Sequence, residues 1–333
     1  MAKTLEPGLE KILRDFRIRP RQVKRSGNIY KIDTGDYQFA LKEVKTHLKV
    51  DLFRLFQWLN SRGFVQHLPL VPDRYGNYVK WFEGKYYYLM PWIKEMAISQ
   101  KGKKKQMFSE LARLHLLTVQ TIPVTEEVVH IHYDALQTRW QQEETFLLQF
   151  LERCERKWYM SPFEWRYVFY FHEIMSAYRF ALDCLNRWRD VVLDSKRSRT
   201  CLIHGQLHLN HYLIDERNVG YFINFEKSRI ASPVMDLLLY LTRSLHTYPE
   251  PEGDEFFLLK CYQEIFSLTE TEILLLQSYL AHPGAIIAIV NDYEKKQVTN
   301  HEWKYTKKIE RFYWAFKNRE RLIRKMAEER EEK

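Results

Sequence analysis

Strand-like alternation of apolar and polar residues marks the first ninety positions of the chain. Four segments follow the two-residue period of a β-strand: 28–32, 37–44, 78–81 and 86–90. Polar residues at 33–36 predict a turn between the first two segments. We therefore predict a small, antiparallel, strand-rich lobe over residues 1–93.

One helical pattern lies between these pairs of strands. Apolar residues recur at three- and four-residue steps from Val50 to Ser61. Gly63 follows closely, and glycine commonly stands just after the last residue of a helix. The sequence thus predicts one helix inside the first lobe.

The hydrophobic period becomes helical after Met90-Pro91-Trp92-Ile93, which we interpret as a crossing into a second lobe. Four later segments carry the helical period: 107–115, 135–192, 233–242 and 309–326. The second of these is long enough for two helices, and Ser161-Pro162 predicts the break. We expect a larger, mainly helical lobe over residues 94–333 and an α+β, bilobal fold for the chain.

The composition is that of a folded protein rich in aromatic residues. Of 333 residues, 45% are hydrophobic and 29% are charged, and a chain of this length can bury a sizeable core. Aromatic residues make up 15%, with 21 Tyr, 20 Phe and 9 Trp. We expect most of these side chains to pack in the core, although such residues also supply apolar surface for assembly.

The net charge of +9 admits an anionic partner, and nucleic acid is the first to consider. The basic residues are spread along the chain, apart from the run between Lys101 and Lys105 and a tail of mixed sign. No zinc-finger or RNA-binding aromatic signature accompanies them. We interpret the charge as a solvated basic surface and predict no nucleic-acid partner.

Cysteine spacing and the lengths of the apolar segments indicate the cellular compartment in which the protein is made. The four cysteines form no C-x-x-C pair, which argues against a zinc ribbon or a disulfide scaffold. The first seven residues lack the apolar core of a signal peptide. The apolar run 285–290 is too short to span a bilayer. We expect a protein without a membrane span that is synthesised in the cytoplasm.

The segment 203–215 has the spacing of a phosphotransfer loop but lacks its chemistry. Such loops follow His-x-Asp-x-x-x-x-Asn, where Asp orients the acceptor hydroxyl and Asn holds magnesium. Here Gln206 stands at the Asp position and His211 at the Asn position, and Asn224 replaces a second acidic metal ligand in the next hairpin. Glutamine takes no proton at neutral pH, histidine suits magnesium poorly, and an amide lacks the charge that this cation favours. These three changes argue against ordinary ATP–magnesium catalysis.

Lys42 is the candidate phosphate-binding lysine. It ends the strand sequence Phe39-Ala40-Leu41-Lys42, which resembles the Val-Ala-Ile-Lys of kinase-type lobes; a lone strand lysine is otherwise an exposed charge. Met90, at the crossing between lobes, is the second candidate for a nucleotide site. The acid nearest the start of the following helix is Asp51, for which we favour a surface role over pairing with Lys42. The segment 25–28 holds one glycine, so it is a poor phosphate-covering loop.

Histidines in the loop allow another interpretation. His204, His208 and His211 could bind a transition metal, but the loop is not helical, and we favour a structural role for His204. Further along, Pro233 and Asp236 predict a helix start, with the aspartate reaching back to the loop backbone.

These residues together resemble the aminoglycoside phosphotransferase and choline kinase superfamily. Its loop has the form His-Gly-Asp-x-His-x-x-Asn-x-Leu-x-Asp, followed by Ile-Asp-Phe-Glu and Asp-Pro-x-x-Asp-Leu. The positions that agree are His204, Gly205, His208, Leu213, Asp215, Ile223, Phe225, Glu226, Pro233, Asp236 and Leu237. The positions that differ are Gln206, His211, Asn224 and Ser232. The resemblance implies a bilobal, protein-kinase-like fold, with ATP and magnesium as cofactors only where nucleotide binding is retained.

Within that superfamily the chain most resembles the kinase-like spore coat proteins of endospore-forming bacteria. The strand Phe-Ala-Leu-Lys-Glu-Val, the crossing Tyr-Tyr-Tyr-Leu-Met-Pro-Trp-Ile and the basic, Tyr-rich, Gly-poor composition carry this likeness. It implies synthesis in the mother-cell cytoplasm, deposition in the spore coat and other coat proteins as partners.

Three functions remain at this point. The first is a structural coat protein with a degenerate, inactive kinase site. The second is an active ATP-dependent phosphotransferase acting on a small-molecule hydroxyl through unconventional residues. The third is a scaffold that binds nucleotide without turnover.

Overall fold

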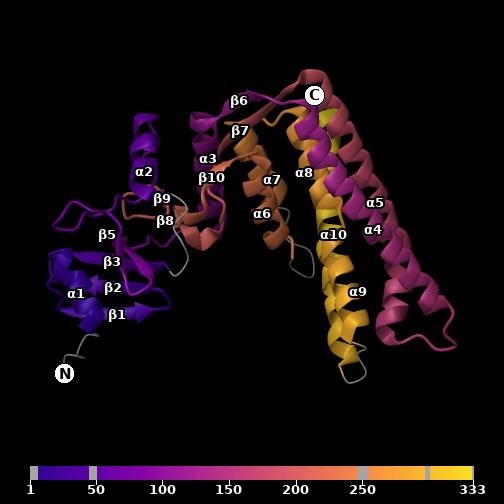
Figure 1. Cartoon of the computed structure of the whole chain (residues 1–333), viewed down its shortest axis with the longest axis horizontal. Coiled ribbons are helices and arrows are strands. Elements are labelled where there is room, and N and C mark those ends of the chain that lie inside the picture. The colour runs from indigo at the N-terminus through magenta and orange to yellow at the C-terminus, as the bar shows by residue number, and fades with distance from the viewer. Residues whose placement is uncertain (1–6, 45–50, 247–253, 297–300, 332–333) are drawn as a thin grey trace. The chain divides into compact units, whose positions relative to one another are not determined.

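A computed structural model describes residues 7–44, 51–246, 254–296 and 301–331 (Figure 1). The residues before position 7, which bear on the signal-peptide expectation, lie outside these ranges. The chain divides into two compact units. The sheet unit comprises the residues up to Thr118 together with His204–Arg229, and the helical unit comprises Val119–Ile203 and the residues from Ile230 onward. This division by contacts does not coincide with the predicted boundary after residue 93, because residues 94–118 and the loop segment both group with the sheet.

An antiparallel five-stranded sheet forms the centre of the sheet unit. In spatial order its strands are β1 (Gln22–Ser26), β2 (Ile29–Asp33), β3 (Gln38–Val44), β5 (Lys85–Pro91) and β4 (Lys80–Phe82). The four predicted strands are confirmed, with shifts of one or two residues at their ends. The sequence did not predict β1, whose residues are almost all exposed and polar.

Strand alternation gives the sheet two different faces. One face packs against the helix α1 (Pro7–Asp15) and forms an apolar core. Buried side chains of this core include Ile12, Leu13, Tyr30, Leu41 and Leu89. The other face carries Ala40, Lys42, Tyr88 and Met90, which pair across β3 and β5. A lysine therefore lies on a buried strand face.

The predicted helix is α2 (Leu52–Ser61), and its first predicted residue, Val50, lies outside the described residues. Asp51 is its N-cap and accepts a hydrogen bond from the backbone N–H of Arg54 at 3.2 Å. Gly63, with φ of +80°, follows the helix end as expected.

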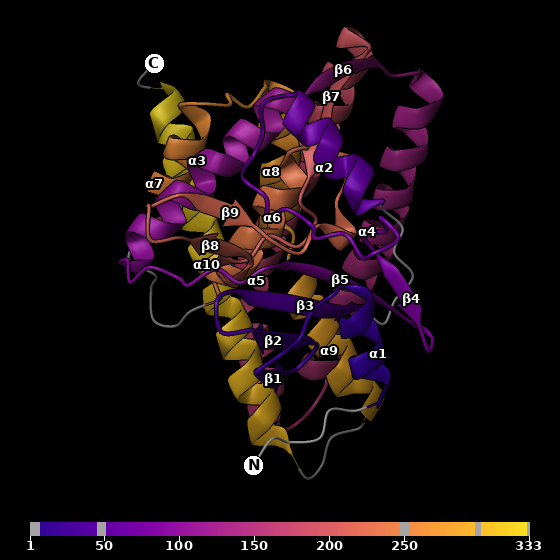
Figure 2. The same ribbon diagram turned by 90° about the vertical axis from the view of Figure 1, so that its left-hand side faces the viewer.

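The loop segment folds as a short hairpin beside the sheet. The strands β8 (Tyr212–Ile214) and β9 (Gly220–Phe222) are preceded by a 3-10 turn, η1 (Leu209–His211), and followed by another, η2 (Phe225–Lys227). Helix α3 (Gln100–Thr118) contacts η1 and β9. In Figures 1 and 2 the hairpin lies on the same side of the sheet as α2, whose Phe56 packs edge-on against Phe225.

The helical unit contains the long hairpin of α4 (Glu126–Glu155) and α5 (Pro162–Ser195). Ser161 caps α5 through a capping box with Glu164, which confirms the predicted break. Helix α5 packs against α4, α8 (Glu270–Ala281) and α10 (Glu302–Glu331).

The remaining elements of this unit are short. The strand elements are β6 (Gln120–Pro123), β7 (Arg197–Ile203) and β10 (Arg229–Ala231), in the spatial order β10-β7-β6. The helices are α6 (Val234–Ser244), α7 (Asp254–Gln263) and α9 (Gly284–Lys296). The sequence predicted α6 and α10 but not α7, α8 or α9.

The stretch Glu270–Lys296 is long enough to cross a membrane, and its most apolar 18-residue window has a mean hydropathy of 1.8. The expectation based on 285–290 overlooked this longer stretch. However, 78% of its most apolar window is buried, and α8 ends at Ala281 before α9 begins at Gly284. By packing, these residues form two core helices of the helical unit.

Candidate functional site

A tight turn at Gly205 shapes the loop. Gly205 has φ of +74°, and a Cβ atom there would lie 2.3 Å from the carbonyl oxygen of Lys227, so only glycine fits. The buried His204 donates from Nε2 to the carbonyl oxygen of Ile223 at 2.8 Å and accepts at Nδ1 from the N–H of Gln206 at 3.3 Å. These contacts support the structural role expected for His204.

His211 also binds the loop backbone. Its Nδ1–H donates to the carbonyl oxygen of Gln206 at 2.8 Å. His208 accepts from the N–H of Asn210 through Nδ1 at 3.0 Å. At least four of the six ring nitrogens of the three histidines are therefore engaged with backbone. Among the described residues, no group of three or more His, Cys, Asp or Glu is placed to hold a metal ion.

Lys42 reaches the segment after the hairpin, where it binds two side chains, and a third side chain binds one of these. Its Nζ donates to Oδ1 of Asn224 at 2.5 Å and forms an ion pair with Oε1 of Glu226. The hydroxyl of Tyr88 donates to the same carboxylate oxygen at 2.5 Å. The Lys42 and Glu226 side chains are only 8% and 10% exposed. The predicted phosphate-site lysine is thus buried and bonded within the protein.

Burial and charge shift the pKa values of Lys42 and Glu226 in opposite directions. Burial lowers the pKa of Lys42, and the Glu226 carboxylate partly offsets that effect. For Glu226, burial opposes ionisation, but the Lys42 charge and the bonds from Lys42 and Tyr88 outweigh it, so its pKa is lowered. Burial, followed by the Glu226 charge, raises the pKa of Tyr88. We therefore treat Lys42 and Glu226 as an ion pair at neutral pH.

Helix α2 provides no acid to Lys42. Asp51 is its N-cap and forms an exposed ion pair with Arg54 at 3.3 Å, which agrees with the surface role favoured above. The ten residues of α2 include no Asp or Glu. The carboxylate that pairs with Lys42 comes from Glu226 in η2 instead.

The segment 25–28 forms the tight connection between β1 and β2, in which Ser26 pairs with Ile29. Gly27, with φ of +59°, allows this turn. Arg25 points to the buried carboxylate of Glu43 at 3.7 Å. The segment 25–28 therefore has the geometry of a hairpin turn.

The side chains at the site do not fit a magnesium ion. Asn224 stands in the left-handed region, with φ of +70°, and its oxygen already accepts from a lysine. Glu226 is the one carboxylate among the residues that Lys42 contacts, and it too is paired. Gln206 and His211 add no negative charge. A hard cation requires anionic oxygen ligands, and here a lysine cation lies between the two candidate ligands.

The two other predicted residues, Met90 and Asp236, are both buried. Met90 is buried on β5 opposite Ala40, on the face that carries Lys42. Asp236 is fully buried in the first turn of α6, in the helical unit. After burial itself, its charge is the next cause that raises the pKa of the Cys201 thiol. Its expected contact with the loop backbone stays a prediction.

Sequence reasoning missed the contacts of Tyr88 and Glu226 with Lys42. The strand register provided a signal for Tyr88, because it stands directly opposite Lys42 in the β3–β5 pair. Glu226 could have been considered as a partner once α2 offered no acid.

Residues 30–261 match the family model described as the phosphotransferase enzyme family, APH. That match covers most of the chain, and the chain belongs to this family. A comparison with curated proteins gave no match.

Solved structures share the fold at low sequence identity. An aminoglycoside phosphotransferase from Alicyclobacillus acidocaldarius subsp. acidocaldarius DSM 446 is 15% identical, with a TM-score of 0.75 over 100% of this chain and 98% of that one. The microcompartment-associated aminopropanol kinase is 15% identical, with a TM-score of 0.56 over 95% and 97%. Spectinomycin phosphotransferase APH(9)-Ia is 13% identical, with a TM-score of 0.54 over 92% and 96%. The α+β, protein-kinase-like fold expected from the sequence is confirmed.

Proposed function

We propose that this chain is a kinase-fold protein that does not transfer phosphate and that serves as a structural component of the bacterial spore coat. The observation that carries the first half is the bond from Lys42 to Oδ1 of Asn224, because it occupies the oxygen at a metal-ligand position where the charge of an aspartate is also missing. Phosphoryl transfer depends on positive charge directed at phosphates and on metal held by carboxylates. Here neither position 206 nor position 224 carries a carboxylate, and Gln206 stands where a catalytic aspartate is required.

The test of inactivity is a direct assay of the purified chain. We expect no magnesium- or manganese-dependent transfer from ATP to sugars, choline, aminoglycosides or amino alcohols above the rate without protein. Sustained turnover that is lost in Lys42→Ala would overturn the proposal. Turnover that persists in Lys42→Ala would indicate a contaminating kinase and would call for repurification.

Nucleotide binding without turnover is tested separately. A ligand that binds only the folded state raises the melting temperature. We expect ATP to produce little shift in the chain, because Gln206, His211 and Asn224 supply no anionic ligand for the metal ion that bridges its phosphates. A large shift that does not require a metal ion would favour the nucleotide-binding scaffold.

An active phosphotransferase is the second candidate. Membership of the family and the placement of Lys42 against the loop hairpin favour it. Glu226 is a carboxylate that could hold a metal if Lys42 moved away. The assay above decides between this function and the first.

The coat assignment rests on the resemblance of the strand around Lys42, the aromatic crossing and the Tyr-rich, basic composition. We propose synthesis in the mother cell, deposition in the coat and other coat proteins as partners, with no nucleic-acid partner. A fluorescent fusion followed during sporulation tests this. Signal that remains in the mother-cell cytoplasm after coat formation, with no chain extractable from purified coats, would overturn it.

A further inference from the structure

The outer face of α5 carries aromatic residues at positions where a surface helix ordinarily carries charge. The exposed positions follow a helical stripe: Trp165, Phe169, His172, Ser176 and Phe180. Trp165 is 52% exposed, Phe169 63% and Phe180 41%. The first two rings stack, with centroids 5.4 Å apart and planes at 13°. Exposed aromatic side chains of this kind are enriched at protein–protein interfaces.

A cavity of about 430 Å³ borders the same stripe. It lies between α5 and α10, and its apolar lining includes Ala177, Phe180 and Phe316. This volume is in the range of pockets that enclose small ligands, so it has room for an aromatic side chain. The stripe thus combines protruding rings with a recess on one face of one helix.

The charges around the cavity are paired with one another. Lys317 lies 2.6 Å from Glu173 and 2.5 Å from Glu320, and Arg324 pairs with Glu320 as well. This rim is balanced in charge on a chain with a net charge of +9. A nucleic acid or an anionic membrane selects unpaired basic residues, whereas two copies of a basic protein avoid repulsion by meeting at a neutral patch.

We infer that the α5 stripe is the interface of a two-fold dimer, in which α5 of one copy lies antiparallel to α5 of a second copy. An axis between positions 172 and 173 brings Trp165 opposite Phe180 and Phe169 opposite Ser176. Phe169 then faces the small residues beside the partner's cavity. His172 meets Glu173 across the axis. Such a patch is self-complementary, as a two-fold interface requires.

The exposed area of the rings alone is too small for a stable dimer. Taking ~200 Å² for each aromatic side chain, the three rings expose roughly 300 Å² per chain. Two copies bury roughly 600 Å² from rings alone, about half of the 1,200 Å² at the lower end of stable interfaces. The rim of α10 must supply the rest, so dimerisation should depend on protein concentration. This inference is independent of phosphoryl transfer and of the coat assignment.

Sedimentation velocity across a wide range of concentration tests the interface. We expect the wild-type chain to pass from monomer to dimer, and Phe169→Glu to raise the dissociation constant roughly 30-fold or more, as loss of a central aromatic anchor does. Ile131→Glu is the matched control, because Ile131 is 64% exposed on α4, outside the stripe. Circular dichroism confirms that both variants fold. A wild-type chain that stays monomeric, or a dimer insensitive to Phe169→Glu, would overturn the inference.

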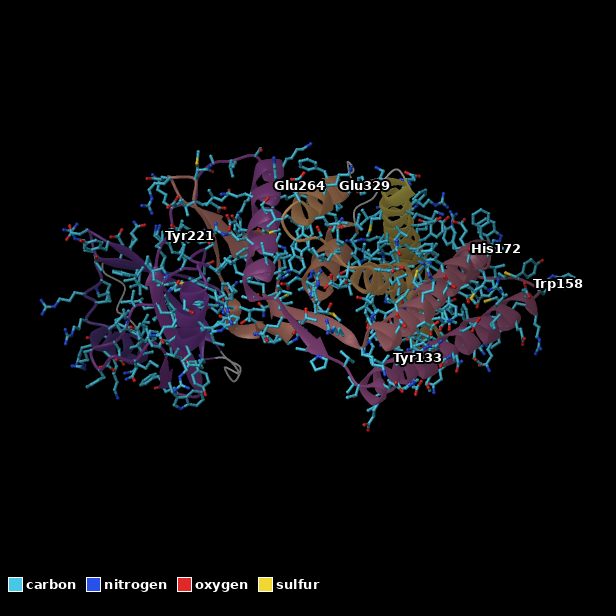
Figure 3. All side chains as sticks on the ribbon, turned by 90° about the horizontal axis from the view of Figure 1, so that it is seen from above. Tyr133, Trp158, His172, Tyr221, Glu264 and Glu329 are labelled. Carbon is cyan, nitrogen blue, oxygen red and sulfur yellow. The ribbon has the colours of Figure 1, made fainter. Side chains whose placement is uncertain are left out.

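Cysteine crosslinking tests the register. All four native cysteines are buried, so an introduced surface cysteine reacts selectively. Figure 3 labels His172 on α5 and Trp158 in the connection between α4 and α5. His172→Cys stands at the axis and should form a disulfide-linked dimer on mild oxidation. Arg187→Cys is exposed on the same helix but would lie roughly 40 Å from its copy, at 1.5 Å per residue. Equal crosslinking of the two variants would overturn the antiparallel arrangement.

Discussion

Lys42 donates a hydrogen bond to Asn224 across 2.5 Å, which joins the candidate phosphate-binding lysine to the position of a metal ligand. An aspartate at 224 would place a second negative charge beside Glu226, whereas the amide of Asn224 adds none. Glu226 supplies the negative charge that balances Lys42. The positive charge of Lys42 is therefore balanced within the protein.

The Lys42–Glu226 pair should contribute strongly to the stability of the sheet unit. Removing one partner of a buried ion pair leaves an uncompensated charge, so Glu226→Gln should lower the free energy of unfolding by about 3–5 kcal/mol. The double variant Lys42→Met/Glu226→Gln should lose less than the sum of the two single variants, because no charge is stranded. Chemical denaturation of the four proteins measures this coupling. Strictly additive losses would show that the two side chains do not interact in solution.

Metal-dependent nucleotide binding should return when the family residues are restored. The triple variant Gln206→Asp/His211→Asn/Asn224→Asp places carboxylates and an amide oxygen at positions suited to magnesium. We expect ATP to raise its melting temperature only when magnesium is present, by an amount equivalent to about 2.7 kcal/mol at a hundredfold excess over Kd.

Adding Lys42→Ala to that triple variant is the control, and it should abolish the shift. A triple variant that fails to respond to magnesium would mean that binding was lost for reasons outside these three positions.

Local patterns predicted the elements whose side chains alternate between core and solvent. The strands β2, β3 and β5 fit this description, as does the break at Ser161. The sequence missed β1 because it is polar on both faces. It missed α8 because apolar residues surround that helix, which leaves no period to detect.

The candidate site was predicted as a set of residues but not as a set of contacts. The strand pattern identified Lys42, and loop spacing identified Gln206, His211 and Asn224. The bond from Lys42 to Glu226 joins residues 184 positions apart, and no local period specifies such a pair. Only the register of the sheet against the hairpin brings them together.

Gly205→Ala tests the turn that shapes the loop. The added Cβ would meet the Lys227 carbonyl oxygen at 2.3 Å, and φ of +74° disfavours any side chain. Gly63→Ala is the matched control, because φ is +80° there and nothing lies within 4 Å of its Cβ. We expect a loss of about 1–2 kcal/mol for Gly63→Ala from backbone strain alone, and a clearly larger loss for Gly205→Ala. Similar losses in thermal unfolding would show that the loop relaxes freely around residue 205.

His211 should make stability depend on pH. Burial is the largest cause that lowers its pKa, and the neighbouring His204, His208 and Lys42 lower it further, against the opposing bond to Gln206. The unfolded chain then binds a proton near pH 6.5, where folded His211 stays neutral. Its contribution to stability is therefore complete above pH 6.5 and is lost as the pH falls through the lower, folded pKa.

His211→Asn should remove this component, so the free energy of unfolding should decline less between neutral pH and pH 5.5 than in the wild type. His67, whose pKa burial also lowers, remains in the variant and preserves part of the decline. Denaturation at a series of pH values measures both profiles, and an NMR titration assigns the His211 ring directly. An unchanged profile in the variant, or a His211 ring that titrates at or above pH 6.5, would contradict the buried position of the imidazole beside Lys42.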